Sequence, residues 1–135
     1  MGGYKNNKQI KSVECYNQDL DTWTPCADMK ICHSSPGVTV QKGYIYVVSR
    51  SGAERYDPQQ NTWSQICSLE VDQFYIACVS LNNELWAIGG KSKSADKLCG
   101  SVFDEENFCW VERGSLPKSN VYNGFVVPES FLSSM

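Results

Sequence analysis

An aromatic residue followed seven positions later by a tryptophan occurs three times along this chain. The pairs are Tyr16 and Trp23, Tyr56 and Trp63, and Phe103 and Trp110, and the tryptophans are 40 and 47 residues apart. Gly37, Ala77 and Gly124 repeat the same two steps. Such a fixed spacing is typical of stacked repeats, in which each unit buries its apolar face against its neighbours.

Each unit is expected to consist of short β-strands. Apolar segments rich in β-branched and aromatic residues alternate with turn-forming residues, as in GVTV, YIYVV, YIACVS and LWAIG. Four strands that recur every 40 to 47 residues predict the blades of a β-propeller. The extra residues of the longer step fall in the polar stretch KSKSADKL, which we expect to be a loop.

Charge and composition exclude several classes of protein. The 135 residues include 12 Lys and Arg against 15 Asp and Glu, a net charge of -3, whereas a nucleic-acid-binding domain carries a basic excess. No apolar run approaches the roughly 20 residues of a membrane span. The cysteines are odd in number, lack C-x-x-C spacing and accompany a single histidine. We therefore expect free thiols in a reducing, cytoplasmic setting, with no metal site and no cofactor.

In these features the sequence resembles the kelch repeats of β-propeller proteins. That family is marked by a Gly-Gly pair at the end of the second strand, then an aromatic residue, then a tryptophan seven residues later. The matching residues are Gly2, Gly3, Tyr16, Trp23, Tyr56, Asp57, Trp63, Gly89, Gly90, Phe103 and Trp110. We interpret the aromatic positions as packing between blades rather than as a platform for ligands.

Two departures from the family's pattern stand out. Ser49-Arg50 occupies the place of the Gly pair in the second unit, although Gly52 is close by. The family often has an arginine four residues after the position of Met29. Here the repeat-related residues at that place are His33, Gln73 and Asn120.

The resemblance predicts an all-β, partial kelch propeller of about three four-stranded antiparallel blades in an open ring. We expect a partial blade at 1–28, complete blades at 29–68 and 69–115, and the first strand of a further blade plus a tail at 116–135. Since roughly four to eight blades close a ring, we expect this chain to be part of a longer one, with unpaired edges that favour association.

The expected topology places basic residues on one loop face of the blades and acidic residues on the opposite one. Loops after the second and fourth strands of each blade share one face, where Lys5, Lys8, Lys11, Lys30, Arg50, Lys91, Lys93, Lys97 and Lys118 gather. The opposite loops carry Asp19, Asp21, Asp57, Glu84, Asp104, Glu105 and Glu106. We hypothesise that the basic face binds an acidic segment of a partner protein. The alternative is that these lysines only keep the rim solvated.

The candidate partner-binding residues on the basic face are Lys5, Lys8, Lys11, His33, Arg50, Gln73, Tyr75, Lys91, Lys93, Asn120 and Tyr122. Tyr75 and Tyr122 are related by the 47-residue step and are candidate aromatic anchors. A packing role fits both tyrosines equally well.

The resemblance implies a protein-binding module rather than an enzyme. Kelch propellers commonly follow BTB and BACK domains and present substrates to a cullin-RING ubiquitin ligase, so we expect the substrate-recognition part of such an adaptor. The ligase would be reached only through a BTB domain, which is absent from this sequence. The second possibility is an actin-binding, cytoskeletal scaffold. A propeller enzyme is the third, and one histidine leaves no catalytic residues to assign.

Overall fold

The computed structural model describes residues 1–70, 73–92, 99–117, 124 and 126–127, and every regular element among them is a β-strand. The expected all-β class is therefore confirmed. Within this described part, no helix is long and apolar enough to cross a membrane.

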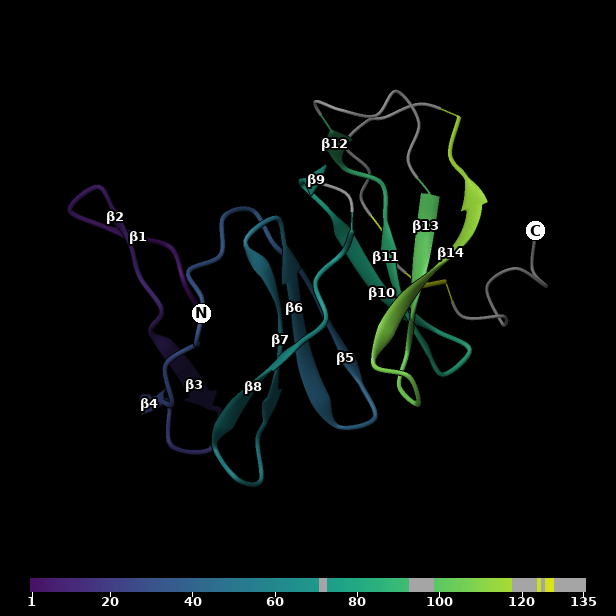
Figure 1. The fold of residues 1–135 in the computed structure, drawn as a ribbon. Helices are drawn as coiled ribbons and strands as arrows, with labels where there is room; N and C mark the ends of the chain where they lie inside the picture. Colours follow the sequence, from purple (N-terminus) through teal and green to yellow (C-terminus); the bar gives the residue numbers. More distant parts are fainter. Residues whose placement is uncertain (71–72, 93–98, 118–123, 125, 128–135) are drawn as a thin grey trace.

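Residues 37–66 form a four-stranded antiparallel sheet (Figure 1). Its strands are β5 (Gly37–Gln41), β6 (Tyr44–Ser49), β7 (Gly52–Asp57) and β8 (Thr62–Ile66), and each pairs with the next along the chain. The register sets Tyr56 opposite Trp63. A sheet in which consecutive strands meet through short turns is the form of a propeller blade.

A second sheet repeats this plan. It consists of β10 (Ala77–Leu81), β11 (Glu84–Ile88), β13 (Cys99–Asp104) and β14 (Cys109–Ser115), in that order. Phe103 lies opposite Trp110, as Tyr56 lies opposite Trp63. The ladder between β13 and β14 shifts register between Cys99 and Gly100.

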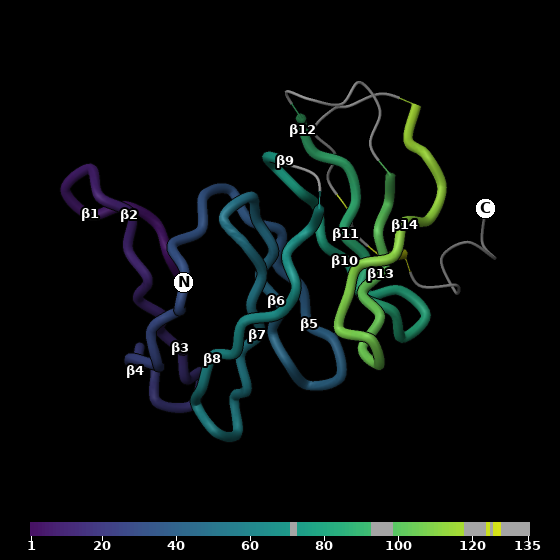
Figure 2. The backbone as a smooth tube through the Cα atoms, in the orientation of Figure 1, coloured from purple at the N-terminus to yellow at the C-terminus, as the bar shows by residue number. Residues whose placement is uncertain are grey.

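The first unit contributes a two-stranded sheet, β3 (Val13–Asn17) with β4 (Thr22–Cys26), in which Tyr16 faces Trp23. Two small ladders lie in the connections: β1 (Tyr4–Lys5) with β2 (Lys8–Gln9), and β9 (Gln73–Phe74) with β12 (Lys91–Ser92). The three stacked sheets confirm the open, partial propeller, and the tube in Figure 2 follows the chain from one sheet to the next.

Positive-φ residues make the tight turns between strands. The central residues of three two-residue turns all have φ between 48° and 80°; they are Asn6-Asn7, Lys42-Gly43 and Asn82-Asn83. Two successive positive φ angles define the type I′ turn, whose twist matches that of paired strands. The turn residues thus join each pair of strands in a hairpin.

A side-chain oxygen organises each wider turn between the last two strands of a unit. The Oδ1 atom of Asp57 accepts hydrogen bonds from the backbone N–H groups of Gln59 and Gln60, at 2.9 and 3.2 Å. Asn17 and Asp104 make the same bonds in the other two units. Such Asx turns stabilise the loop before the tryptophan strand begins.

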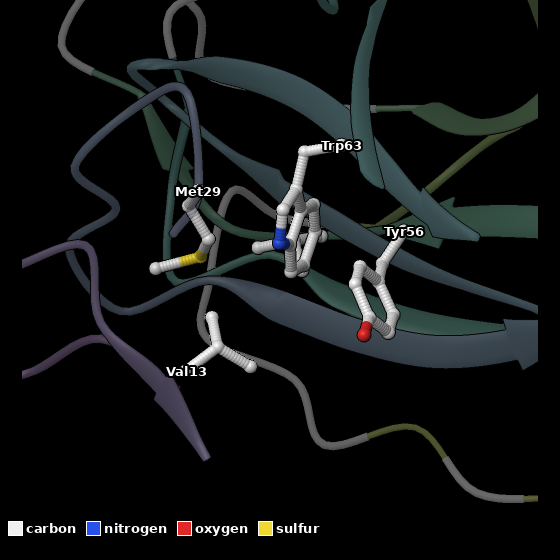
Figure 3. Close-up of a cluster of buried hydrophobic side chains, with 5 residues drawn as sticks. Val13, Met29, Tyr56 and Trp63 are labelled. Atoms are coloured by element: carbon white, nitrogen blue, oxygen red, sulfur yellow. The ribbon is translucent and has the colours of Figure 1, made fainter. Parts of the chain in front are cut away.

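The core lies between sheets rather than within a single one. Figure 3 shows Val13 of strand β3 and Met29 of the connection between the first two sheets near Tyr56 and Trp63 of the second sheet. Between the second and third sheets, Tyr46 packs with Leu85 and Phe103. Each blade therefore completes its apolar core only with a neighbour beside it.

The inner strands β5 and β10 approach each other closely at Gly37. A Cβ atom at this position would lie 2.6 Å from Cys78 Sγ and 2.7 Å from the carbonyl oxygen of Ile76. Only glycine fits such an approach. The 40- and 47-residue steps from Gly37 reach Ala77 and Gly124, so small residues recur where inner strands meet.

The departure at Ser49-Arg50 leaves the second blade's turn intact. In the third unit Gly89 and Gly90 have φ of 71° and 103°, whereas neither Ser49 nor Arg50 has a positive φ. In the second blade the positive φ is supplied by Gly52 instead, which has a φ of 137° at the start of β7. The expected first strand of a further blade falls mostly on residues outside the described part of the chain.

Candidate partner-binding loop face

Antiparallel hairpins place alternate connections on opposite sides of the sheets. The upper loop face consists of 4–11, 29–35, 49–52, 69–70 and 91–92, and the lower loop face of 17–22, 41–43, 57–62, 81–84 and 104–109. In Figure 1 the β1–β2 hairpin and strands β9 and β12 lie on the upper side, and the β7–β8 turn lies on the lower side.

Lysines cluster on the upper loop face near the first unit. Lys5 and Lys8 are exposed and lie opposite each other in the β1–β2 ladder. The backbone N–H of Met29 donates to the carbonyl oxygen of Lys11 at 3.0 Å, so the chain at Lys11 runs beside the chain at Lys30. The ammonium group of Lys11 also donates a 2.6 Å hydrogen bond to the carbonyl oxygen of Lys30. Both lysines of the β1–β2 ladder belong to a small hairpin in the connection that precedes strand β3.

An aromatic ring sits among the cations at the other end of this face. The guanidinium carbon of Arg50 lies 4.5 Å from the centroid of the Phe74 ring, a cation–π contact. Lys91 pairs with Phe74 in the β9–β12 ladder and is exposed. Tyr75 follows with half of its surface exposed and a φ of 59°. Arg50, Phe74, Tyr75 and Lys91 thus form one polar and aromatic cluster.

His33 does not belong to the exposed surface, contrary to its place among the candidate contacts. The residue is only 5% exposed, because its imidazole is taken up by a buried network. Its Nε2 atom lies 2.7 Å from Glu54 Oε1, and its Nδ1 atom lies 2.7 Å from Ser49 Oγ. A carboxylate can only accept, so Nε2–H donates to Glu54, and the Ser49 hydroxyl is the hydrogen-bond partner of Nδ1.

Glu54 is fully buried in strand β7 and is held by three donors. Besides His33, the backbone N–H groups of Lys30 and Ile31 donate to its carboxylate, at 2.8 and 3.2 Å. Ser49 in turn accepts from the backbone N–H of Ser51 at 3.1 Å. The network ties the 30–33 connection to the β6–β7 turn, which is a structural task rather than recognition of a partner.

Gln73 is also buried, at 5% exposure, and is the second candidate contact that the structure removes from the surface. It lies at the 40-residue step from His33, so the two share an inward position in their units. Lys93, Asn120 and Tyr122 lie outside the described residues. The described candidates that remain on the surface are Lys5, Lys8, Lys11, Arg50, Tyr75 and Lys91.

The repeat-defining aromatic residues differ in exposure along the chain. Tyr56, Trp63 and Phe103 are buried between sheets. Tyr16 and Trp23, at the open side of the first unit, are 41% and 65% exposed. Their rings still contact each other in a tilted arrangement, with centroids 5.2 Å apart and an interplanar angle of 41°.

Seven acidic residues gather on the lower loop face. The described acidic residues there are Asp19, Asp21, Asp57, Glu84, Asp104, Glu105 and Glu106. Lys42 is the basic residue of this face, and its Nζ atom lies 2.8 Å from Glu105 Oε2. Both partners are well exposed, so the pair contributes at most about 1 kcal/mol.

The described part of the chain offers no grouping of three His, Cys, Asp or Glu side chains suited to a metal ion. All seven cysteines are free thiols. The Ser49–His33–Glu54 arrangement contains the residue types of a hydrolase site, but burial of all three denies a substrate access to Ser49.

The stacked antiparallel sheets, joined through aromatic–tryptophan pairs, define part of a repeat-built β-propeller. Residues 1–30 match the family model of the Kelch motif. Kelch-like protein 40 of Xenopus tropicalis is 32% identical over 118 residues, which cover 82% of this chain and 19% of that protein. Kelch repeat and BTB domain-containing protein 6 of Homo sapiens is 32% identical over 117 residues, 87% of this chain and 16% of that protein.

The chain belongs to the kelch-repeat family, as the sequence resemblance predicted. Kelch-like protein 35 of Mus musculus is a further relative, 26% identical over 127 residues, 87% of this chain and 21% of that protein. The chain spans about a fifth of the length of these relatives. Its relatives and its fold together support a protein-binding kelch module.

Proposed function

We propose that this module binds an acidic segment of a partner protein through its upper loop face. The proposal rests on the separation of basic and acidic residues between the two loop faces. The described basic residues of the upper loop face are Lys5, Lys8, Lys11, Lys30, Arg50 and Lys91, and its described acidic residue is Glu70. Charge of one sign on one face steers an oppositely charged partner and fixes its orientation.

The cluster of Arg50, Phe74, Tyr75 and Lys91 adds aromatic rings to the basic residues of this face. Arg50 is held over the Phe74 ring, so its guanidinium loses little freedom when a partner binds. The backbone of Lys91 pairs with Phe74 in the β9–β12 ladder, which places a second cation near this ring. Tyr75 presents an exposed ring beside them. Aromatic and arginine side chains often supply most of the binding energy of an interface.

The whole protein is proposed to act as the substrate-recognition part of a BTB-kelch adaptor of a cullin-RING ubiquitin ligase in the cytoplasm, by binding alone. The support is the similarity to relatives such as Kelch repeat and BTB domain-containing protein 6. In this proposal the chain supplies a partial blade at 1–28 and complete blades at 29–68 and 69–115, and a BTB domain elsewhere in a longer polypeptide contacts the cullin.

The loop-face proposal is tested with a fluorescent peptide of alternating glutamate and serine as the probe. Reversing the charge of Lys91 to glutamate should weaken binding several-fold and lower its salt dependence, because one cation is replaced by an anion. Lys42→Glu on the lower loop face makes the same change in net charge and serves as the control. Equal effects of the two reversals would show that only net charge matters, and would refute the proposal.

The adaptor proposal needs a different experiment. The complete transcript around this reading frame is sequenced, and its product is tested for co-purification with a cullin. A BTB-encoding segment and recovery of the cullin are the expected results. Co-sedimentation with actin filaments, without cullin recovery, would instead favour the scaffold alternative.

A further inference from the structure

Two exposed aromatic residues adopt a backbone conformation that suits neither of them. Within the described part of the chain, Tyr75 and Phe108 are the aromatic residues with a positive φ, at 59° and 50°. Such a φ is tolerated by asparagine and aspartate, whereas a bulky residue is strained by it. Asparagine occupies five of the other positions with a positive φ: Asn6, Asn7, Asn61, Asn82 and Asn83. A bulky ring at such a position points to a role other than local folding.

The backbone on both sides of Tyr75 is fixed by close contacts with the second and third sheets. A Cβ atom at Gly90 would lie 2.7 Å from the carbonyl oxygen of Phe74. On the other side, a Cβ atom at Gly37 would lie 2.7 Å from the carbonyl oxygen of Ile76, whose side chain is buried between these sheets. Both approaches need glycine, so the residue between Phe74 and Ile76 has little freedom to change its φ.

Half of the Tyr75 surface faces solvent, although residues next to it are turned inward. Gln73 and Ile76 are each 5% exposed, whereas Tyr75 is 50% exposed. The equivalent position 40 residues earlier is Ser35, which has a φ of 48° and carries no ring. The fold therefore accommodates a small polar residue at this position, and the aromatic ring is an addition of the third unit.

The charges near Tyr75 decide what kind of group its ring can receive. The adjacent Phe74 has the Arg50 guanidinium 4.5 Å from its ring centroid, and the exposed Lys91 pairs with Phe74 in the β9–β12 ladder. A cationic ligand would meet like charges there, which disfavours a cation–π contact with Tyr75. An acidic residue of a partner suits these cations, and the ring beside them then favours an uncharged, apolar side chain.

We propose that Tyr75 sets the specificity of the upper loop face by receiving an apolar side chain that lies next to an acidic residue in the partner segment. This inference rests on the proposed function, because the acidic residues dock the segment on the same face. The ring is carried by a fixed backbone, so binding orders little of the chain. Charge alone accepts any acidic segment, whereas the contact with Tyr75 distinguishes segments by the neighbouring side chain.

The test compares the binding of two fluorescent peptides to the full chain by anisotropy. One is the alternating glutamate and serine peptide, and the other has one central serine replaced by phenylalanine. The wild type should bind the phenylalanine peptide about tenfold more tightly, because one aromatic contact is added. Tyr75→Asn should remove this preference, bind the first peptide as the wild type does, and melt no earlier, because asparagine suits a φ of 59°. Tyr75→Phe should keep the preference.

Phe108→Asn is the matched control, because it makes a like exchange at an exposed ring with a φ of 50° on the lower loop face. It should leave the binding of both peptides unchanged. Equal wild-type affinities for the two peptides, or a preference that survives Tyr75→Asn, would overturn this inference and leave the charge-based function standing. A lower melting temperature in Tyr75→Asn, with binding of both peptides lost, would assign the ring to packing. A wild type that binds neither peptide would refute the proposed function as well.

Discussion

His33 and Glu54 form a fully buried pair whose atoms Nε2 and Oε1 lie 2.7 Å apart. The pair links the connection between the first two sheets to the central strand β7. The resemblance places an arginine of the family at the position of His33. This chain therefore holds a buried carboxylate with an imidazole at a point where a permanent cation is common.

Removing the imidazole should destabilise the fold strongly. In His33→Ala, Glu54 keeps its two backbone donors but loses its side-chain partner, and we expect a loss of about 3 kcal/mol in the free energy of unfolding. Ser49→Ala removes the outer member of the network and should cost about 1 kcal/mol. Urea denaturation measures both. Equal costs would mean that the carboxylate does not depend on His33.

The two tryptophans Trp63 and Trp23 should respond differently to the same substitution. Trp63→Phe removes a buried indole and its hydrogen bond to Ala27, and should cost about 1–3 kcal/mol. Trp23→Phe changes an exposed ring and should stay within about 0.5 kcal/mol. Thermal unfolding of the matched pair compares them. A larger loss at Trp23 would contradict the packing described for the first unit.

The thiol of Cys78 should be unreactive in the folded protein. Burial raises its pKa from the ordinary 9.0 to about 12, so almost no thiolate exists at neutral pH. Iodoacetamide at pH 8 should label the exposed thiols Cys15 and Cys67 and spare Cys78 until the chain unfolds. Peptide mass spectrometry reads the sites directly. Early labelling of Cys78 would show that strand β10 opens locally.

The same thiol predicts a loss of stability in alkali. Since the folded pKa is the higher one, the unfolded chain releases the Cys78 proton first, above pH 9, and the folded state loses stability from there up to about pH 12. The slope should approach about 1.4 kcal/mol per pH unit within that window. Cys78→Ala should flatten this part of the profile, whatever it does to stability at neutral pH. An unchanged slope would assign the effect to other groups.

Gly37→Ala tests the close approach of the inner strands. The added methyl group would meet the Cys78 sulfur and the Ile76 carbonyl oxygen at distances that no Cβ atom tolerates, so strands β5 and β10 must separate. Overpacking of this kind costs about 1–3 kcal/mol. Val38→Ala, an exposed change in the same strand, is the control. Equal stabilities would show that the strands are free to shift apart.

The fold could be predicted from the sequence because its determinants recur. The aromatic and tryptophan residues, the type I′ turn residues and the small residue at Gly37 each appear at repeat-related positions. One such position alone is weak, but several that share the same two steps leave few alternatives. Ser49-Arg50 shows that a unit tolerates loss of one mark when a nearby glycine takes over the backbone conformation.

The inward position of His33 and Gln73 was harder to predict. Both lie in connections between sheets, which usually run over the surface, and sequence spacing does not tell which side chain turns inward. A signal was present in Glu54, which lies two residues before Tyr56 and so shares the face of the strand that carries this repeat-related aromatic ring; a carboxylate on a buried face needs a partner. The only histidine of the chain was the natural candidate for that partner.

The hydrogen bonds from Trp63 to Ala27 and from Trp110 to Cys67 also bear on how the molecule comes apart. Each runs from one sheet to the main chain of the sheet before it, so a sheet loses such a bond only when its immediate neighbour melts. Unfolding is therefore expected to begin at a sheet that has a neighbour on one side alone and to proceed sheet by sheet from there. The β3–β4 ribbon should therefore fray first, and amide hydrogen exchange should slow from that ribbon toward strands β6 and β7.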